Sequence, residues 1–62
     1  MTCYKLIFKN GTIEYIPAYY AIKNDDNDEV IFLTEHNEVM IFGNVDKLYE
    51  VVQATRIVEV ES

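Results

Sequence analysis

The stretch Val30–Phe42, VIFLTEHNEVMIF, decides the fold that this sequence predicts. Two apolar runs flank a short polar segment, which is typical of a β-hairpin. Closing the hairpin at residues 35–38 places Phe32 opposite Ile41. Both faces are then apolar, with Ile31, Leu33, Met40 and Phe42 on one and Val30, Phe32, Val39 and Ile41 on the other. Such a hairpin must be covered on both sides, so we expect the rest of the sheet to cover one face, and a helix or a second molecule to cover the other.

The pair Asn10-Gly11 predicts a second hairpin, between TCYKLIFK and TIEYI. Asn-Gly is the preferred pair for a two-residue type I′ turn, in which both central residues have positive φ. That turn places Phe8 opposite Ile13 and Leu6 opposite Tyr15. The predicted core face then carries Tyr4, Leu6, Phe8, Ile13 and Tyr15.

One short helix is predicted near residues 45–54. Asn44 is an acceptable N-cap, and Asp46 in the first turn complements the positive end of the helix. Apolar residues recur at helical spacing at Val45, Leu48, Val51 and Val52. The alternative is a strand, because several of these residues are β-branched.

The remaining segments complete a single domain over residues 1–62. Pro17 ends or interrupts the second strand, residues 18–22 read as a further short extended segment, and the tail from Thr55 alternates like a final strand. The predicted class is α+β and mostly β, in the order ββββαβ. We expect a bent antiparallel sheet or a small open barrel of about five strands.

Composition narrows the classes of function. The net charge is −6, from 11 acidic and five basic residues, which disfavours direct binding to nucleic acid. No leader-like segment or membrane-length apolar run is found in the sequence, so we expect a cytoplasmic protein that does not enter a membrane. Cys3 is the sole cysteine, which excludes a disulfide within the chain.

The acidic run KNDDNDEVIFLTE, Lys23–Glu35, raises the question of a calcium loop. Several residues match calcium-ligand positions, but Glu29 occupies the position where the loop requires glycine, and strands rather than helices flank the run. We interpret the run as a polar turn, stabilised by its own Asn and Asp side chains. Zinc is equally disfavoured, since Cys3 and His36 are the only soft or borderline ligands. The sequence thus predicts neither a metal site nor a cofactor.

No catalytic group is predicted. His36 lies in a hairpin turn, where neither a pocket nor a positioned partner is expected. Gly11 and Gly43 stand alone, so no phosphate-binding glycine loop is present, and Ser62 is the last residue of the chain. We therefore predict that the protein is not an enzyme.

The favoured function is an acidic protein-binding module that inhibits or adapts a basic, nucleic-acid-handling protein, and that itself forms a homodimer. The predicted acidic surface is Asp25, Asp26, Asp28, Glu29, Glu35 and Glu38, and the predicted oligomer interface is Val30, Phe32, Val39, Ile41, Tyr19 and Tyr20. The alternative is that the acidic residues serve only to keep the protein soluble and bind no partner. Two other functions stay open: an assembly subunit that associates through apolar strands, and a small nucleic-acid-binding barrel that stacks bases on Tyr15, Tyr19, Tyr20 and Tyr49. In length, acidity and tyrosine content, the chain resembles the small accessory proteins that many viruses and mobile elements encode.

Overall fold

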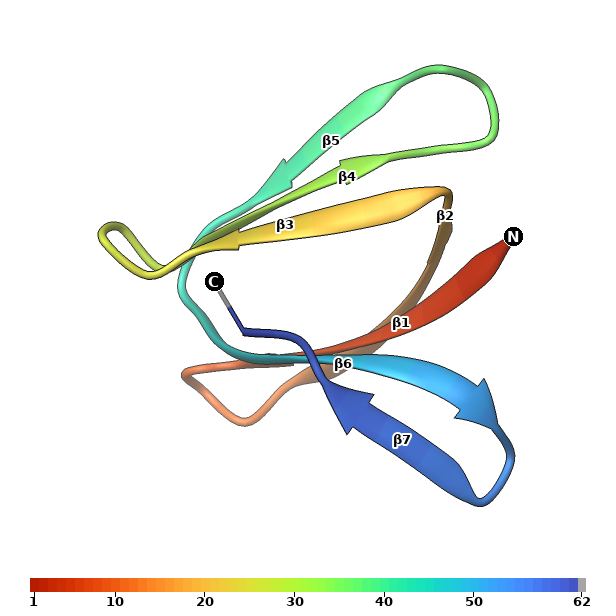
Figure 1. The fold of residues 1–62 in the computed structure, drawn as a ribbon. Helices are drawn as coiled ribbons and strands as arrows, with labels where there is room; N and C mark the ends of the chain where they lie inside the picture. Colours follow the sequence, from red (N-terminus) through yellow and green to blue (C-terminus); the bar gives the residue numbers. More distant parts are fainter. Residues whose placement is uncertain (62) are drawn as a thin grey trace.

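The computed structural model describes residues 1–61, which form seven β-strands in two antiparallel sheets and no helix (Figure 1). The strands are β1 Thr2–Phe8, β2 Ile13–Ala18, β3 Tyr20–Asn24, β4 Glu29–Leu33, β5 Val39–Phe42, β6 Val45–Gln53 and β7 Arg56–Glu59. One sheet has four strands in the order β2-β1-β6-β7, and the other has three in the order β3-β4-β5. The mostly β character and the strand near residues 18–22 agree with the sequence prediction.

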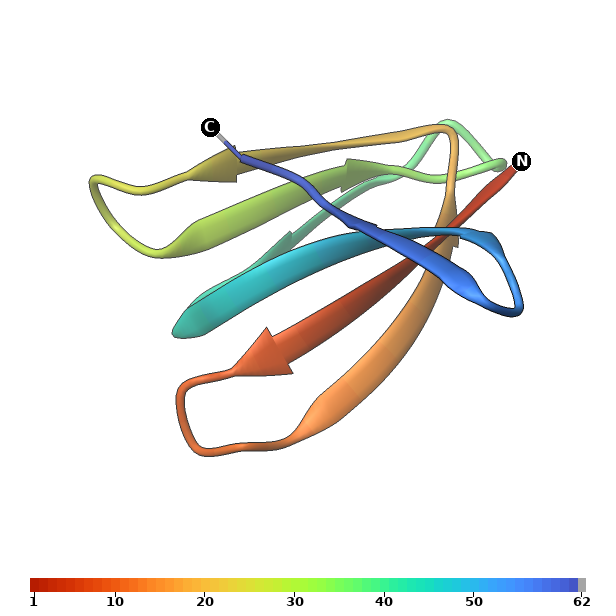
Figure 2. The same ribbon diagram turned by 60° about the horizontal axis from the view of Figure 1, so that its bottom comes forward.

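The two sheets are joined at two corners (Figure 2). The chain turns from β2 into β3 at Ala18 and Tyr19; Ala18 is fully buried, and the Tyr19 amide donates to the Leu33 carbonyl at 2.8 Å. It returns from β5 to β6 through residues 43 and 44. There the Val45 amide donates to the Asp28 carbonyl at 2.9 Å. These bonds satisfy backbone groups that the change of sheet would otherwise leave unpaired.

The hydrophobic core lies between the two sheets. Its buried apolar members are Tyr4, Leu6, Ala18, Val30, Phe32, Val45 and Leu48. Two ring pairs join the sheets: the Phe32 centroid lies 5.6 Å from that of Tyr4, and the Phe42 centroid lies 6.1 Å from that of Phe8. Tilted and edge-on ring pairs of this kind add to the stabilisation that comes from burial.

The predicted helix at residues 45–54 is wrong, because this segment is strand β6, which pairs with β1 and β7. The α+β class, the order ββββαβ and the single bent sheet or open barrel of about five strands are wrong with it, since seven strands form two sheets. A β-bulge explains the misleading spacing. Leu6 pairs with Leu48 and Phe8 with Val45, so two steps along β1 match three along β6. The extra residue lets Val45 and Leu48 both face the core at a separation of three, which imitates a helix.

The predicted register of the first hairpin is also wrong by one residue. Ile7, not Phe8, pairs with Ile13. The turn closes with the Gly11 amide donating to the Phe8 carbonyl at 2.9 Å, and the Phe8 amide donating to the Thr12 carbonyl at 2.9 Å. Within this loop only Gly11 takes a positive φ, of 88°, so this is a three-residue loop made of a type I turn followed by a bulge residue. The longer loop turns Ile13 and Tyr15 outward and Ile16 inward.

The second hairpin repeats this turn and the same one-residue error. Asn37 takes the bulge position with a φ of 58°, and its amide donates to the Thr34 carbonyl at 3.1 Å. Phe32 therefore pairs with Met40, and Ile31 with Ile41. Because successive side chains point to opposite faces, this shift moves Ile41 to the side of the sheet away from Phe32.

Candidate protein-docking face

The outer face of the three-stranded sheet carries two rows of apolar side chains. Cross-strand pairing aligns them as Tyr20, Leu33 and Val39 in one row and Ile22, Ile31 and Ile41 in the other. We call these six residues the apolar face. Tyr20, Ile22, Val39 and Ile41 are each at least half exposed, at 50%, 54%, 63% and 61%. The face is thus an exposed cluster of large apolar side chains, which in a monomer commonly marks an interaction site.

The opposite side of the same strands is the core. Val30 and Phe32 are fully buried there, so neither is available to a partner, although both were predicted in the oligomer interface. The other predicted members Val39, Ile41 and Tyr20 lie on the apolar face, and Tyr19 is 54% exposed at the corner beside it. The sequence prediction of a hairpin with two apolar faces is confirmed, with only one of those faces covered by the other sheet.

Ile22, Ile31 and Leu33 belong to the apolar face, and sequence reasoning did not place them there. The signal was present in β3, where Tyr20 and Ile22 alternate with Ala21 and Lys23. Reading that alternation across the hairpin requires the register of the β4–β5 turn, which the sequence prediction had shifted by one residue.

The predicted acidic run forms the β3–β4 turn, and most of its polar groups are engaged locally. The Asn24 side chain accepts from the Asp26 amide at 3.0 Å, and the Asn27 side chain accepts from the Glu29 amide at 3.2 Å. These bonds are the Asx turns that Asn and Asp favour. Asp28 has a positive φ of 57°. The polar-turn interpretation is therefore confirmed.

Two of the acidic side chains in this turn also form ion pairs. Asp25 pairs with Lys23, and Asp28 lies 2.5 Å from the Lys9 ammonium at the β1–β2 turn. Glu29 accepts from the Asn27 side-chain amide at 2.9 Å. Asp26 is exposed at the tip of the turn, so the charge that this turn presents outward is concentrated on fewer residues than the sequence suggests.

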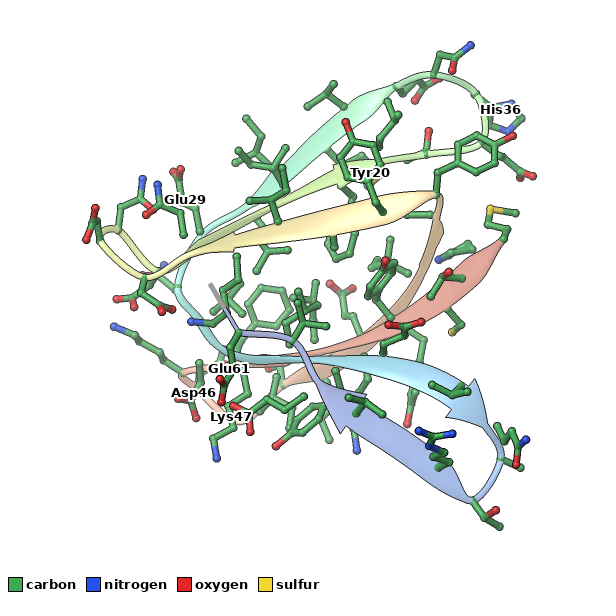
Figure 3. The ribbon with its side chains drawn as sticks, viewed as in Figure 1. Tyr20, Glu29, His36, Asp46, Lys47 and Glu61 are labelled. Carbon is green, nitrogen blue, oxygen red and sulfur yellow. The ribbon has the colours of Figure 1, made fainter. Side chains whose placement is uncertain are left out.

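Glu35 and Glu38 lie in the β4–β5 turn, at the other end of β4. Figure 3 shows Glu29 and His36 at opposite ends of the three-stranded sheet, with Tyr20 on the face between them. The five residues of β4, at about 3.3 Å each, separate the two turns by roughly 16 Å. The predicted acidic residues therefore flank the apolar face at two ends. They do not form one continuous acidic surface.

Charge is distributed unevenly between the two sheets. Residues 19–44, which contain the three-stranded sheet and its turns, hold six acidic side chains and one lysine, a formal charge of −5. The remaining residues hold five acidic and four basic side chains, a formal charge of −1. The one lysine, Lys23, points toward the core side of its strand and is only 12% exposed in its side chain. No basic residue therefore belongs to the apolar face.

The four tyrosines proposed as a stacking platform are divided between the two sheets. Tyr15 and Tyr49 flank Lys5 on the outer face of the four-stranded sheet, because both pair with it across the strands. Tyr19 and Tyr20 lie at the start of the three-stranded sheet. The fifth, Tyr4, is in the core; burial raises its pKa above the usual value, as does the nearby Glu50 carboxylate, while hydrogen bonds with Thr2 and Ala21 act the other way.

Two shallow clefts open at the ends of the sandwich. One, of about 310 Å³, is lined by Lys23, Asp25, Asp46, Lys47, Glu59, Val60 and Glu61. The other, of about 240 Å³, is lined by Ile16, Pro17, Thr34, Glu35, His36, Glu38 and Met40. His36, placed by the sequence in an exposed turn, is indeed at that turn, and its Nε2 lies 3.6 Å from Glu35.

Within residues 1–61, no three His, Cys, Asp or Glu side chains are grouped closely enough to hold a metal ion. The same residues contain no helix that could cross a membrane. Comparison of the chain with protein-family models, curated proteins and solved structures found no match.

Proposed function

We propose that this protein is a non-enzymatic, acidic protein-binding module, and that the apolar face is where its partner docks. The observation that carries the proposal is an exposed apolar surface without any basic residue, bounded at both ends by acidic turns. The complementary surface is an apolar centre with lysine or arginine at its periphery. Proteins that handle nucleic acid present such basic surfaces, which supports an inhibitor or adaptor role.

Affinity and rate would come from different parts of the face. The apolar side chains supply contact area, and tyrosines such as Tyr20 are frequent anchors at protein interfaces. The acidic turns at the rim attract a basic partner over distance and accelerate encounter. Because rim charges are exposed, this attraction weakens as the Debye length shortens from about 10 Å at 0.1 M salt to about 3 Å at 1 M.

Affinity capture with matched variants of the full chain tests the proposal. The face variant carries Ile22→Asn and Ile41→Asn. The control variant carries Ile13→Asn and Ile57→Asn, two positions of similar exposure, 49% and 47%, on the outer face of the other sheet. We expect a set of basic proteins to be retained by the wild-type chain and the control, and lost from the face variant.

A charge variant separates the long-range attraction by the acidic turns from the direct contact made by the apolar face. Asp26→Asn, Glu35→Gln and Glu38→Gln neutralise acidic side chains that hold no lysine or arginine, and so spare the ion pairs of Asp25 and Asp28. The same basic proteins should be weakened on this bait and should elute earlier in a salt gradient. Equal retention on all four baits, or retention of mainly acidic proteins, would refute the proposed function.

A further inference from the structure

The two sheets have four edge strands, and three of them carry features that discourage pairing with another chain. β2 contains Pro17, which lacks an amide donor. β3 carries the inward-pointing Lys23, and β7 is a four-residue strand with Arg56 and Glu59 at its ends. Proline, inward charges and charged ends are the usual protections of a sheet edge.

The fourth edge, β5, is as short as β7, with four residues, but has neither proline nor charge. Its sequence is Val-Met-Ile-Phe, without charge or proline, and no bulge interrupts its pairing with β4. Figure 1 shows β5 as the outermost strand of its sheet, on the side away from β3. An uncharged, apolar and regular edge is a template for adding a strand.

The geometry of the β4–β5 hairpin determines which amide and carbonyl groups of β5 do not bond to β4. The Thr34 amide donates to the Glu38 carbonyl at 2.9 Å, so this pair is hydrogen-bonded across the strands. Hydrogen-bonded and non-hydrogen-bonded pairs alternate in an antiparallel ladder. Met40 and Phe42 therefore bond toward β4, and the amide and carbonyl groups of Val39 and Ile41 point outward from the edge.

We propose that β5 pairs with β5 of a second copy of this chain, antiparallel and around a two-fold axis beside Met40. In this register Val39 of each copy faces Ile41 of the other, so the outward groups of both residues form hydrogen bonds. Side chains of Val39 and Ile41 from the two copies then meet on the outer surface. The result is a continuous six-stranded sheet that carries two apolar faces side by side.

The paired strands themselves bring no like charges together when the partner is a second copy. The contacting segment, Val39–Phe42, contains no charged residue in either copy. Antiparallel pairing also sets Glu38 beside the Phe42 end of the other strand, which keeps the two β4–β5 turns at opposite ends of the shared edge. Stacking the two apolar faces on each other would instead bring together two surfaces with a formal charge of −5 each, which like-charge repulsion opposes.

The dimer is separate from the proposed function, because its hydrogen bonds use the strand edge; it joins the apolar faces of the two copies at Val39 and Ile41 and leaves their outward surface open. The mass of the full chain in solution tests it, measured by sedimentation from about 10 μM to about 1 mM, where interfaces of this small size associate. We expect the average mass to rise toward twice that of one chain. A mass of one chain throughout, as expected if β5 accepts only a strand of a different protein, or a mass that grows beyond two chains, would overturn the proposal.

Two substitutions at one position isolate the backbone bonds. Ile41→Pro removes an outward amide while leaving the bonds to β4, and proline is tolerated on an edge whose amide faces solvent. Ile41→Thr retains that amide. The threonine variant should dimerise and the proline variant should remain at the mass of one chain; equal behaviour of the two contradicts the register.

Hydrogen exchange keeps the test decisive if the proline variant does not fold. In the wild-type chain, the amides of Val39 and Ile41 should exchange more slowly at high than at low protein concentration. The Met40 amide, already bonded to β4, serves as the internal reference. Exchange of Val39 and Ile41 that is unaffected by concentration would also overturn the proposal.

Discussion

Val30→Thr and Val39→Thr are the same isosteric substitution on opposite faces of one hairpin, and we expect very different effects on stability. Val30 is fully buried, whereas Val39 is 63% exposed. At Val30 the threonine hydroxyl enters the apolar core without a hydrogen-bond partner there, which costs about 1–3 kcal/mol. At Val39 the hydroxyl is hydrated and threonine suits a strand, so the change should stay within about 0.5 kcal/mol.

Urea denaturation of dilute protein measures both effects. A chain of 62 residues has a free energy of unfolding of roughly 3–9 kcal/mol, which equals or exceeds the loss expected for either variant. With a slope near 1 kcal/mol/M for so small a domain, the Val30→Thr midpoint should fall by about 1–3 M, and the Val39→Thr midpoint by less than about 0.5 M. The register expected from sequence alone put both valines on one face. Equal shifts would favour that register and refute the one described above.

Two further predictions concern the turn and the buried tyrosine. Gly11→Ala should destabilise the fold by about 1–2 kcal/mol through its positive φ alone, because an added Cβ has no atom within 4 Å. Asn37→Gly should change the melting temperature little. A mild effect of Gly11→Ala would argue against the three-residue loop. The pKa of Tyr4 is higher in the folded chain than its value near 10 in the unfolded chain, so the folded state favours the neutral phenol. This contribution to stability is fully present below the unfolded-chain pKa and is lost as the pH rises through the folded-chain pKa. The stability difference between the wild type and Tyr4→Phe, followed by circular dichroism melts, should therefore shift in favour of the variant above about pH 10, and parallel pH curves would contradict this.

Apart from β6, the sequence predicts the strands well, but it predicts the registers of the two hairpins poorly, for a definite reason. Asn10-Gly11 fits both a two-residue turn and a three-residue turn with glycine as the bulge residue, and these differ by one position in every pair that follows. In the second hairpin the bulge residue is Asn37, which gives an even weaker signal. Side chains were therefore assigned to the wrong faces although the hairpins themselves were identified.

Strand β6 was mistaken for a helix because the bulge opposite Ile7 and Phe8 gives core residues a spacing of three. The spacing of apolar residues along the chain cannot distinguish a helix from a strand that contains a β-bulge. What selects the strand is a long-range demand: β1 has β2 on one side and needs a partner on the other. A short amphipathic helix, marginal by itself, does not supply those hydrogen bonds.

The acidic residues of the candidate site were identified from the sequence, but their arrangement was not. The turns around Asp26 and Glu38 do not form one surface, because β4 connects them and holds them at its opposite ends. The apolar face between them emerged only with the correct register. An apolar face between two acidic ends fits a partner surface that is apolar at its centre and basic at its periphery.

Chemical-shift mapping of the isotope-labelled chain tests the docking proposal most directly. The probe is a synthetic peptide of alternating valine and lysine, compared with the same peptide carrying glutamate for lysine. The proposal predicts shifts at the backbone amides of Ile22, Ile31 and Leu33 with the lysine peptide, reduced by salt and absent with the glutamate peptide. Shifts centred on the outer face of the four-stranded sheet, or equal responses to the two peptides, would contradict it.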